Sequence, residues 1–147
     1  MAGVLAFLLW ACSGETPTPG PDLPVLSSPR QALEAWRRGA AEIARGESGV
    51  AAMTQALEAQ PRTLLLRHWL ALALARSGAL EEALVEVEAV LAVEPGWGLA
   101  HFNRACWLSR LGRVEEAGAA LETALRTGAD PTLLWGEGDL DPLRAQP

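Results

Sequence analysis

The stretch Leu64–Trp97, LLLRHWLALALARSGALEEALVEVEAVLAVEPGW, is followed directly by Gly98–Pro131, GLAHFNRACWLSRLGRVEEAGAALETALRTGADP, and the two carry one pattern displaced by 34 positions. A fixed period of this length is typical of stacked helix pairs, none of which can bury its apolar side alone. The sequence therefore predicts an all-α solenoid. Matching positions include Ala71 with Ala105, Leu74 with Leu108, Gly78 with Gly112, Glu81-Glu82-Ala83 with Glu115-Glu116-Ala117, and Val87 with Leu121.

Each repeat has the composition of two helices joined by a glycine turn. Gly78 and Gly112 follow shortly after Arg76 and Arg110, where a helix end favours a residue that accepts left-handed dihedral angles and a cation near the last carbonyls. Apolar residues then recur at three-and-four spacing, which predicts one buried stripe along the second helix. We expect these stripes to contain Leu80, Ala83, Leu84, Val87, Val90 and Leu91 in one repeat, and Val114, Ala117, Leu121, Ala124 and Leu125 in the next.

The same residues resemble the tetratricopeptide repeat family. Its first helix carries a large, a small and a large residue, and a turn glycine, a second-helix alanine and a closing proline follow. Two positions depart from that pattern, because Val90 replaces a small residue and Arg104 replaces an apolar one. The resemblance implies a groove, lined by the first helices, that binds protein or peptide partners. The matching residues are Leu70, Ala71, Leu74, Gly78, Ala83 and Pro95, then Ala105, Leu108, Gly112 and Ala117.

Residues 29–63 are interpreted as a degenerate first repeat, ahead of the second repeat at 64–97 and the third at 98–131. Ser28, Pro29 and Gln31 have the form of a helix-capping box. The turn at Gly46–Gly49 is displaced by about two positions against the other units. The chain should therefore contain about three helix hairpins. The expected buried residues are Ala32, Leu33, Trp36, Ala40 and Ile43, then Val50, Met53, Ala56 and Leu57.

Residues 132–147 are expected to form a short capping segment. The sequence Asn103-Arg104-Ala105-Cys106, followed much later by Asp139-Leu140-Asp141-Pro142-Leu143-Arg144, resembles the tetratricopeptide end-of-group unit, which implies a cover for the last hairpin. Such a cover is needed because the final helix pair otherwise exposes the surface that another repeat would bury. Asp130-Pro131 and Asp141-Pro142 suit helix caps. The expected sealing residues are Leu133, Leu134, Trp135, Leu140 and Leu143.

The N-terminus has the pattern of a secretory signal at residues 1–11. The apolar run Val4–Trp10 is too short to span a membrane, which takes about 20 apolar residues, but it fits the core of a signal peptide. Leu9-Trp10-Ala11-Cys12 resembles a bacterial lipobox, which implies that Cys12 carries lipid. The Pro-rich stretch 12–28 then reads as a tether, and Ser13 is compatible with sorting to an outer membrane. The alternative is that the apolar N-terminus is not a signal peptide and that Cys12 follows it by chance.

Composition argues against several classes of function. The net charge is −6, and the twelve basic residues are all arginines that are scattered along the chain, whereas nucleic-acid binding needs clustered cations. No phosphate-binding glycine loop, nucleophile elbow or zinc-protease helix motif is present. We therefore expect no cofactor, no metal and no catalysis. The first-turn glutamates Glu81, Glu82, Glu115 and Glu116 are interpreted as favourable helix-dipole partners.

Cys106, His68 and His101 form a candidate reactive or metal-binding set. The two histidines lie on adjacent first helices, 33 positions apart, and could approach one another across the groove. Two histidines without a carboxylate at ligand spacing are a weak zinc signal, and a buried lone thiol is usually an apolar filler. An enzyme that uses Cys106 and His68 is the least favoured alternative.

The expected interaction surface lies on the first helices. Leu72, Phe102 and Cys106 would form an apolar floor, while Arg76 and Arg110 could grip a carboxylate or only cap their own helices. The family's lysine-based carboxylate clamp has no counterpart here because the chain contains no lysine. The predicted groove residues are His68, Leu72, Arg76, Phe102, Asn103, Cys106 and Arg110, and the same face includes Gln31, Glu34, Arg38, Leu65 and Leu99.

Taken together, the anchor, the tether and the stack predict a non-catalytic scaffold that binds a protein or peptide at a bacterial membrane surface. The expected location is the outer membrane, facing the periplasm, and one version of the hypothesis makes the protein an assembly factor. A soluble cytoplasmic adaptor is the alternative. The sequence identifies neither the partner nor the oligomeric state.

Overall fold

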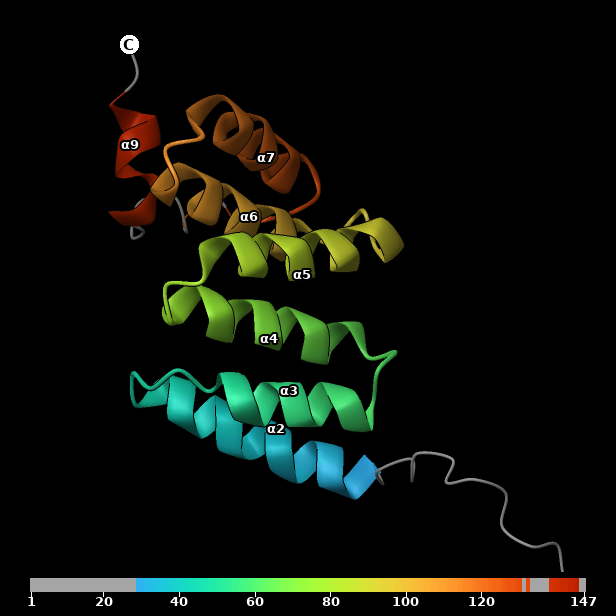
Figure 1. The fold of residues 1–147 in the computed structure, drawn as a ribbon. Coiled ribbons are helices and arrows are strands. Elements are labelled where there is room, and N and C mark those ends of the chain that lie inside the picture. The colour runs from blue at the N-terminus through green and yellow to red at the C-terminus, as the bar shows by residue number, and fades with distance from the viewer. Residues whose placement is uncertain (1–28, 131, 133–137, 146–147) are drawn as a thin grey trace, which may run out of the picture.

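The computed structural model describes residues 29–130, 132 and 138–145, and within these residues every regular element is a helix. Successive helices stack in chain order from α2 at one end to α7 at the other, with α9 beside α6 and α7 (Figure 1). The chain is therefore a helical solenoid. Its elements are α2 (Pro29–Ala44), α3 (Val50–Ala59), α4 (Leu64–Arg76), α5 (Leu80–Val93), α6 (Gly98–Arg110), α7 (Val114–Arg126), the 3-10 helix η1 (Gly138–Leu140) and α9 (Asp141–Arg144).

Left-handed glycines end the first helix of every pair. Gly78 and Gly112 have φ values of 88° and 76°, and Gly46 has 83°. At each site the N–H of the glycine and that of the next residue donate to carbonyls of the last helical turn, which satisfies acceptors that a helix end leaves open. Gly112 follows Gly78 by 34 residues, whereas Gly78 follows Gly46 by 32. The left-handed turn of the first unit is therefore displaced by two residues against the 34-residue period.

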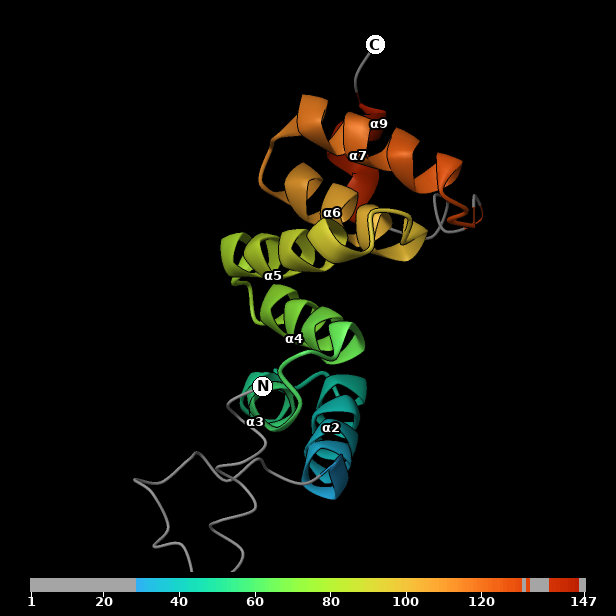
Figure 2. The same ribbon diagram turned by 90° about the vertical axis from the view of Figure 1, so that its right-hand side faces the viewer.

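The helices pair within each hairpin and also pack between hairpins. α2 packs on α3, α4 on α5 and α6 on α7, while α3 packs on α4 and α5 on α6. Figure 2 shows the same succession from the side. Trp36 meets Trp69 edge to face, with ring centroids 6.0 Å apart, which joins α2 directly to α4. The solenoid therefore has one continuous stack rather than three separate hairpins.

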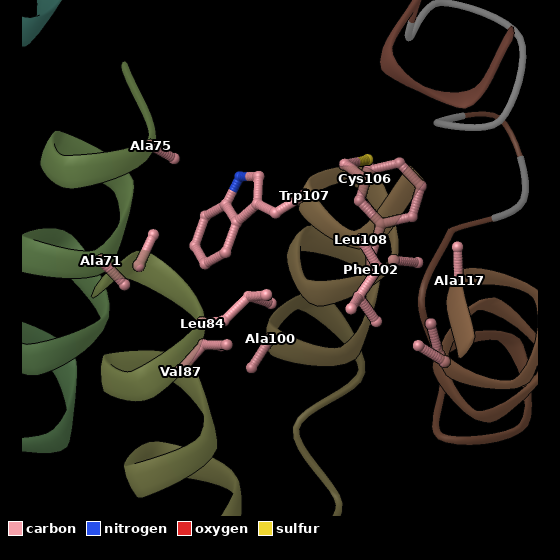
Figure 3. Close-up of a cluster of buried hydrophobic side chains, with 14 of the residues drawn as sticks. Ala71, Ala75, Leu84, Val87, Ala100, Phe102, Cys106, Trp107, Leu108 and Ala117 are labelled. Atoms are coloured by element: carbon pink, nitrogen blue, oxygen red, sulfur yellow. The ribbon is translucent and has the colours of Figure 1, made fainter. Parts of the chain in front are cut away.

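The hydrophobic core runs along the stack and is richest between α4 and α7. Ala71 and Ala75 of α4, Leu84 and Val87 of α5 and Trp107 of α6 belong to one cluster of buried side chains, in which the indole of Trp107 extends from α6 toward α4 and α5 (Figure 3). Small residues let the helix axes approach, and large residues from the neighbouring helix fill the remaining space. α4 also supplies buried residues to the first hairpin, so it connects the two halves of the core.

Two residues expected in buried stripes are exposed. In α2 the buried face is formed by Ala32, Ala35 and Gly39, and this choice of face leaves Leu33 44% exposed. A Cβ on Gly39 would lie 2.9 Å from the methyl carbon of Met53, which shows how closely α2 and α3 approach. In α7 the alanines at 117, 120 and 124 form the stripe, and Leu125 is 39% exposed. Both predictions were wrong because small residues, rather than leucines, face the neighbouring helix.

The C-terminal segment returns to the last hairpin. η1 packs on α6, and α9 contacts both α6 and α7. Leu140 is 1% exposed and belongs to the main core. Asp130 accepts a hydrogen bond from the N–H of Thr132 at 2.8 Å. The predictions for Ser28, Pro131, Leu133, Leu134 and Trp135, and for the Leu143 side chain, lie outside the described residues.

Candidate functional site

The first helices present equivalent side chains along one face of the stack. Leu33, Leu65 and Leu99 each lie 13 residues before the left-handed glycine that ends their own helix. They are 44%, 50% and 45% exposed, and we call them the leucine row. These three residues are large apolar side chains that stay exposed at one repeated position of the first helices. Further along the same helices, Leu72 and Cys106 both lie six residues before the glycine.

A cavity of about 400 Å³ opens on this first-helix face, toward the glycine ends of the helices. It brings together six of the seven groove residues predicted from the sequence, although they come from two helices. An apolar floor from Leu72, Phe102 and Trp107 is bordered by two guanidinium groups. The lining residues are Ile43 of α2, Leu72, Ala75 and Arg76 of α4, Phe102, Asn103, Cys106, Trp107 and Arg110 of α6, and Asp139 of η1.

The two arginines of the cavity differ in their contacts. Arg76 is exposed and makes no hydrogen bond or ion pair within the described part of the chain. Arg110 does not cap its own helix, because its Nη1 donates to the carbonyl of Ala75 in α4 at 3.5 Å. Its Nε lies 3.8 Å from an oxygen of Asp139. The cavity therefore carries one unpaired cation and one that is loosely held, a setting that favours an anionic ligand group.

His68, the seventh predicted residue, is not among the residues that line the cavity. Its ring is 3% exposed, and it stacks on Trp97 with ring centroids 4.7 Å apart. Asn103 Nδ2 donates to its Nε2 at 3.2 Å, so the proton of the neutral ring lies on Nδ1, which has no partner among the described residues. Burial lowers the pKa of His68 to about 4. The histidine thus positions Asn103, which lines the cavity.

The two histidines have different hydrogen-bond partners. His101 Nε2 is hydrogen-bonded to the carbonyl of Pro95 at 2.9 Å, whereas His68 is engaged with Asn103 and Trp97. Within residues 29–130, 132 and 138–145, no group of three potential metal ligands gathers at one place. Cys106 is buried at the cavity wall, and the Nε2 of His68 is already used as an acceptor.

A second hollow continues the first-helix face toward the start of α2 and α4. It has a volume of about 310 Å³ and is lined mainly by apolar side chains, among them Leu33, Trp36, Leu65 and Leu66. Sequence reasoning placed Leu65 on the groove face but assigned Leu33 to the core. Alignment of the first helices on their left-handed glycines, Gly46 and Gly78, matches Leu33 with Leu65. Alignment by the 34-residue period does not.

Comparison with solved structures identifies the fold. The "First TPR of Spaghetti (RPAP3) bound to HSP90 peptide SRMEEVD" aligns over 82% of this chain and 93% of that one, with 19% identity and a TM-score of 0.66. The first TPR domain of human RPAP3 aligns over 80% and 90%, with 20% identity and a TM-score of 0.65. The TPR2AB domain of yeast Sti1, in a complex with pHSP90, aligns over 80% of this chain but 46% of that one, with 20% identity and a TM-score of 0.66.

The chain accordingly has a tetratricopeptide-like helical fold. Neither a family model nor a curated protein matches its sequence. At about one residue in five identical, the likeness establishes how the helices are arranged.

Proposed function

We propose that this protein is a non-catalytic scaffold that binds an extended segment of a partner protein on its first-helix face. The observation that supports the proposal most directly is the cavity in which Arg76, Phe102 and Arg110 meet. The neighbour bound to the HSP90 peptide SRMEEVD is a peptide-binding domain of the same fold, which is consistent with a peptide as the ligand class. The ligand should carry a carboxylate and at least one large apolar side chain.

The dimensions of the face suggest the length of the bound segment. Leu65 and Arg76 are 11 residues apart on α4, which corresponds to about 16 Å along a helix. An extended chain advances roughly 3.3 Å per residue, so about six residues reach from the leucine row to the cations. An apolar side chain near one end and a carboxylate near the other would meet both parts of the surface.

Selection from a random phage-displayed peptide library tests this proposal and requires no identified partner. We expect the protein to select peptides that combine acidic and apolar residues. Fluorescence polarisation with a selected peptide should show at least about tenfold weaker binding by Arg76→Ala plus Phe102→Ala, because a charge-assisted contact and an aromatic anchor are lost together.

The matched control is Arg126→Ala plus Val85→Ala, which removes an exposed arginine and an exposed valine from second helices. Its affinity should stay within about twofold of the wild-type value, since neither residue lies on the first-helix face. Equal losses in the two double variants would contradict the proposed groove.

We further propose that a lipid anchor at Cys12 holds the scaffold at the envelope of a bacterial cell, on the outer membrane and facing the periplasm. The support comes from the lipobox-like Leu9-Trp10-Ala11-Cys12 and the Pro-rich tether, both outside the described residues. None of the described helices combines the length and the apolar character of a membrane span. An anchored groove would hold its partner at the membrane surface, which suits an assembly factor.

Metabolic labelling tests the anchor. Radioactive palmitate should enter the wild-type protein but not Cys12→Ala, and the wild type should be recovered with membranes. Equal incorporation in both, together with soluble recovery, would favour the cytoplasmic adaptor instead.

A further inference from the structure

The C-terminal segment places an acidic side chain inside the groove. Asp139 belongs to η1 and lines the same cavity as Arg76 and Arg110. The next residue, Leu140, is 1% exposed and packs in the main core. Because Leu140 fixes the backbone of η1, the carboxylate of Asp139 stays near the cavity while its side chain can still change partners.

The contact between Asp139 and Arg110 is an ion pair without a hydrogen bond. The Nε–Oδ1 distance is 3.8 Å, beyond the range of a hydrogen bond. By comparison, Arg113 holds Glu116 through two hydrogen bonds of 2.7 and 2.6 Å. The contact of Arg110 with the Ala75 carbonyl is also long, at 3.5 Å. The guanidinium group of Arg110 therefore attracts anions, but neither Asp139 nor the Ala75 carbonyl forms a short hydrogen bond with it.

We propose that Asp139 is an internal competitor for Arg110 that a ligand carboxylate displaces. This inference rests on the proposed function, and it adds a specificity-determining residue to the groove. A carboxylate entering the cavity can form the short, forked hydrogen bonds that Asp139 does not form. A segment without a carboxylate leaves the Arg110–Asp139 pair in place and does not compete with Asp139. Asp139 therefore lowers the affinity of the groove for acidic segments more than its affinity for neutral ones.

The energetic cost of the exchange is small. The side chains of Arg110 and Asp139 are 36% and 40% exposed, and exposed ion pairs of this kind contribute little to stability. Leu140 keeps η1 on α6 after the exchange, so the ligand has to move one side chain and not the whole C-terminal segment. Removal of the Asp139 charge should therefore strengthen binding of an acidic peptide about two- to fivefold.

The test uses fluorescein-labelled SRMEEVD as the acidic probe and the full chain as the binding protein. Polarisation titrations compare the wild type with Asp139→Asn, which keeps the shape of the side chain and removes its charge. The matched control is Glu88→Gln, because Glu88 also pairs with an arginine, Arg104 at 3.3 Å, but does not line the cavity. It changes the net charge by the same amount, so general attraction of an acidic probe is accounted for.

Asp139→Asn should lower the Kd about two- to fivefold, and Glu88→Gln by no more than about 1.5-fold. The increase in affinity should vanish when Arg110→Ala is added, because Asp139 then has no Arg110 side chain for which to compete with the peptide. Equal gains in Asp139→Asn and Glu88→Gln, weaker binding by Asp139→Asn, or a gain that survives Arg110→Ala would overturn the inference.

The outcomes also separate this inference from the proposed function. Wild-type binding without a gain in Asp139→Asn overturns the competitor role and leaves the groove intact as a binding site. Absence of binding by both proteins counts against both ideas. Circular dichroism of each variant confirms that the helices are retained.

Discussion

Acidification should weaken the fold through His68. The ring is 3% exposed, and burial lowers its pKa from 6.5 to about 4. Protonation would place a charge beside Trp97 and would put a proton on Nε2, where Asn103 Nδ2 now donates. Two donors would then face each other in a site from which water is largely absent.

The direction and size of the effect follow from linkage. Between pH 6.5 and about pH 4 the unfolded chain binds a proton at His68 that the folded chain does not bind. The free energy of unfolding therefore falls as the pH falls through this window and levels off below it. At 1.36 kcal/mol for each unit of pKa difference, the loss amounts to at most about 3 kcal/mol. Stability from the neutral ring is fully present above pH 6.5.

Urea unfolding followed by circular dichroism between pH 7.5 and pH 4 measures this loss. His68→Gln is the reference, because its amide oxygen can accept from Asn103 but does not titrate. Carboxylates titrate in both proteins, so their effect cancels in the difference between the two stabilities. That difference should move by about 3 kcal/mol in favour of His68→Gln on acidification. Parallel curves for the two proteins would refute the assigned burial and hydrogen bond of His68.

Three further predictions concern stability and are measured by urea unfolding at pH 7.5. Gly98→Ala should lower the free energy of unfolding by about 1–3 kcal/mol, because its Cβ would lie 2.8 Å from the backbone nitrogen of Ala129. An unchanged free energy of unfolding would contradict that close approach. Gly78→Ala should cost about 1 kcal/mol through its φ of 88° alone, whereas the control Gly96→Ala should cost less. Leu108→Ala, at a fully buried site, should cost about 2–5 kcal/mol, and a smaller loss would argue against tight packing.

Much of the fold could be predicted because the same residue types recur at the same helix and turn positions of successive repeats. The glycines at 78 and 112 mark the helix ends, and both have the positive φ that the pattern predicts. Apolar spacing identified Ala83, Val87 and Val90 as buried. Leu72 and Phe102, which line the cavity, could be placed on one side of the stack because the position of a residue along the first helix determines which face it occupies.

Contacts between repeats could not be predicted in the same way. The pairing of Arg110 with the Ala75 carbonyl and with Asp139 depends on the distance between neighbouring elements, which no periodicity encodes. The hydrogen bond from Asn103 to His68 has the same origin. The equivalence of Leu33 and Leu65 was not evident from the sequence. The turn glycines Gly46 and Gly78 are 32 rather than 34 residues apart, and the buried face of α2 is formed by small residues.

Mapping of amide chemical shifts in ¹⁵N-labelled protein, during titration with a phage-selected peptide, would locate the binding surface on the stack of helices. The largest shifts should occur on α4 and α6 around Leu72 and Phe102, and they should extend toward the leucine row at higher occupancy. Shifts confined to the second helices, for example around the exposed Val85 and Val93 of α5, would contradict a binding groove on the first-helix face.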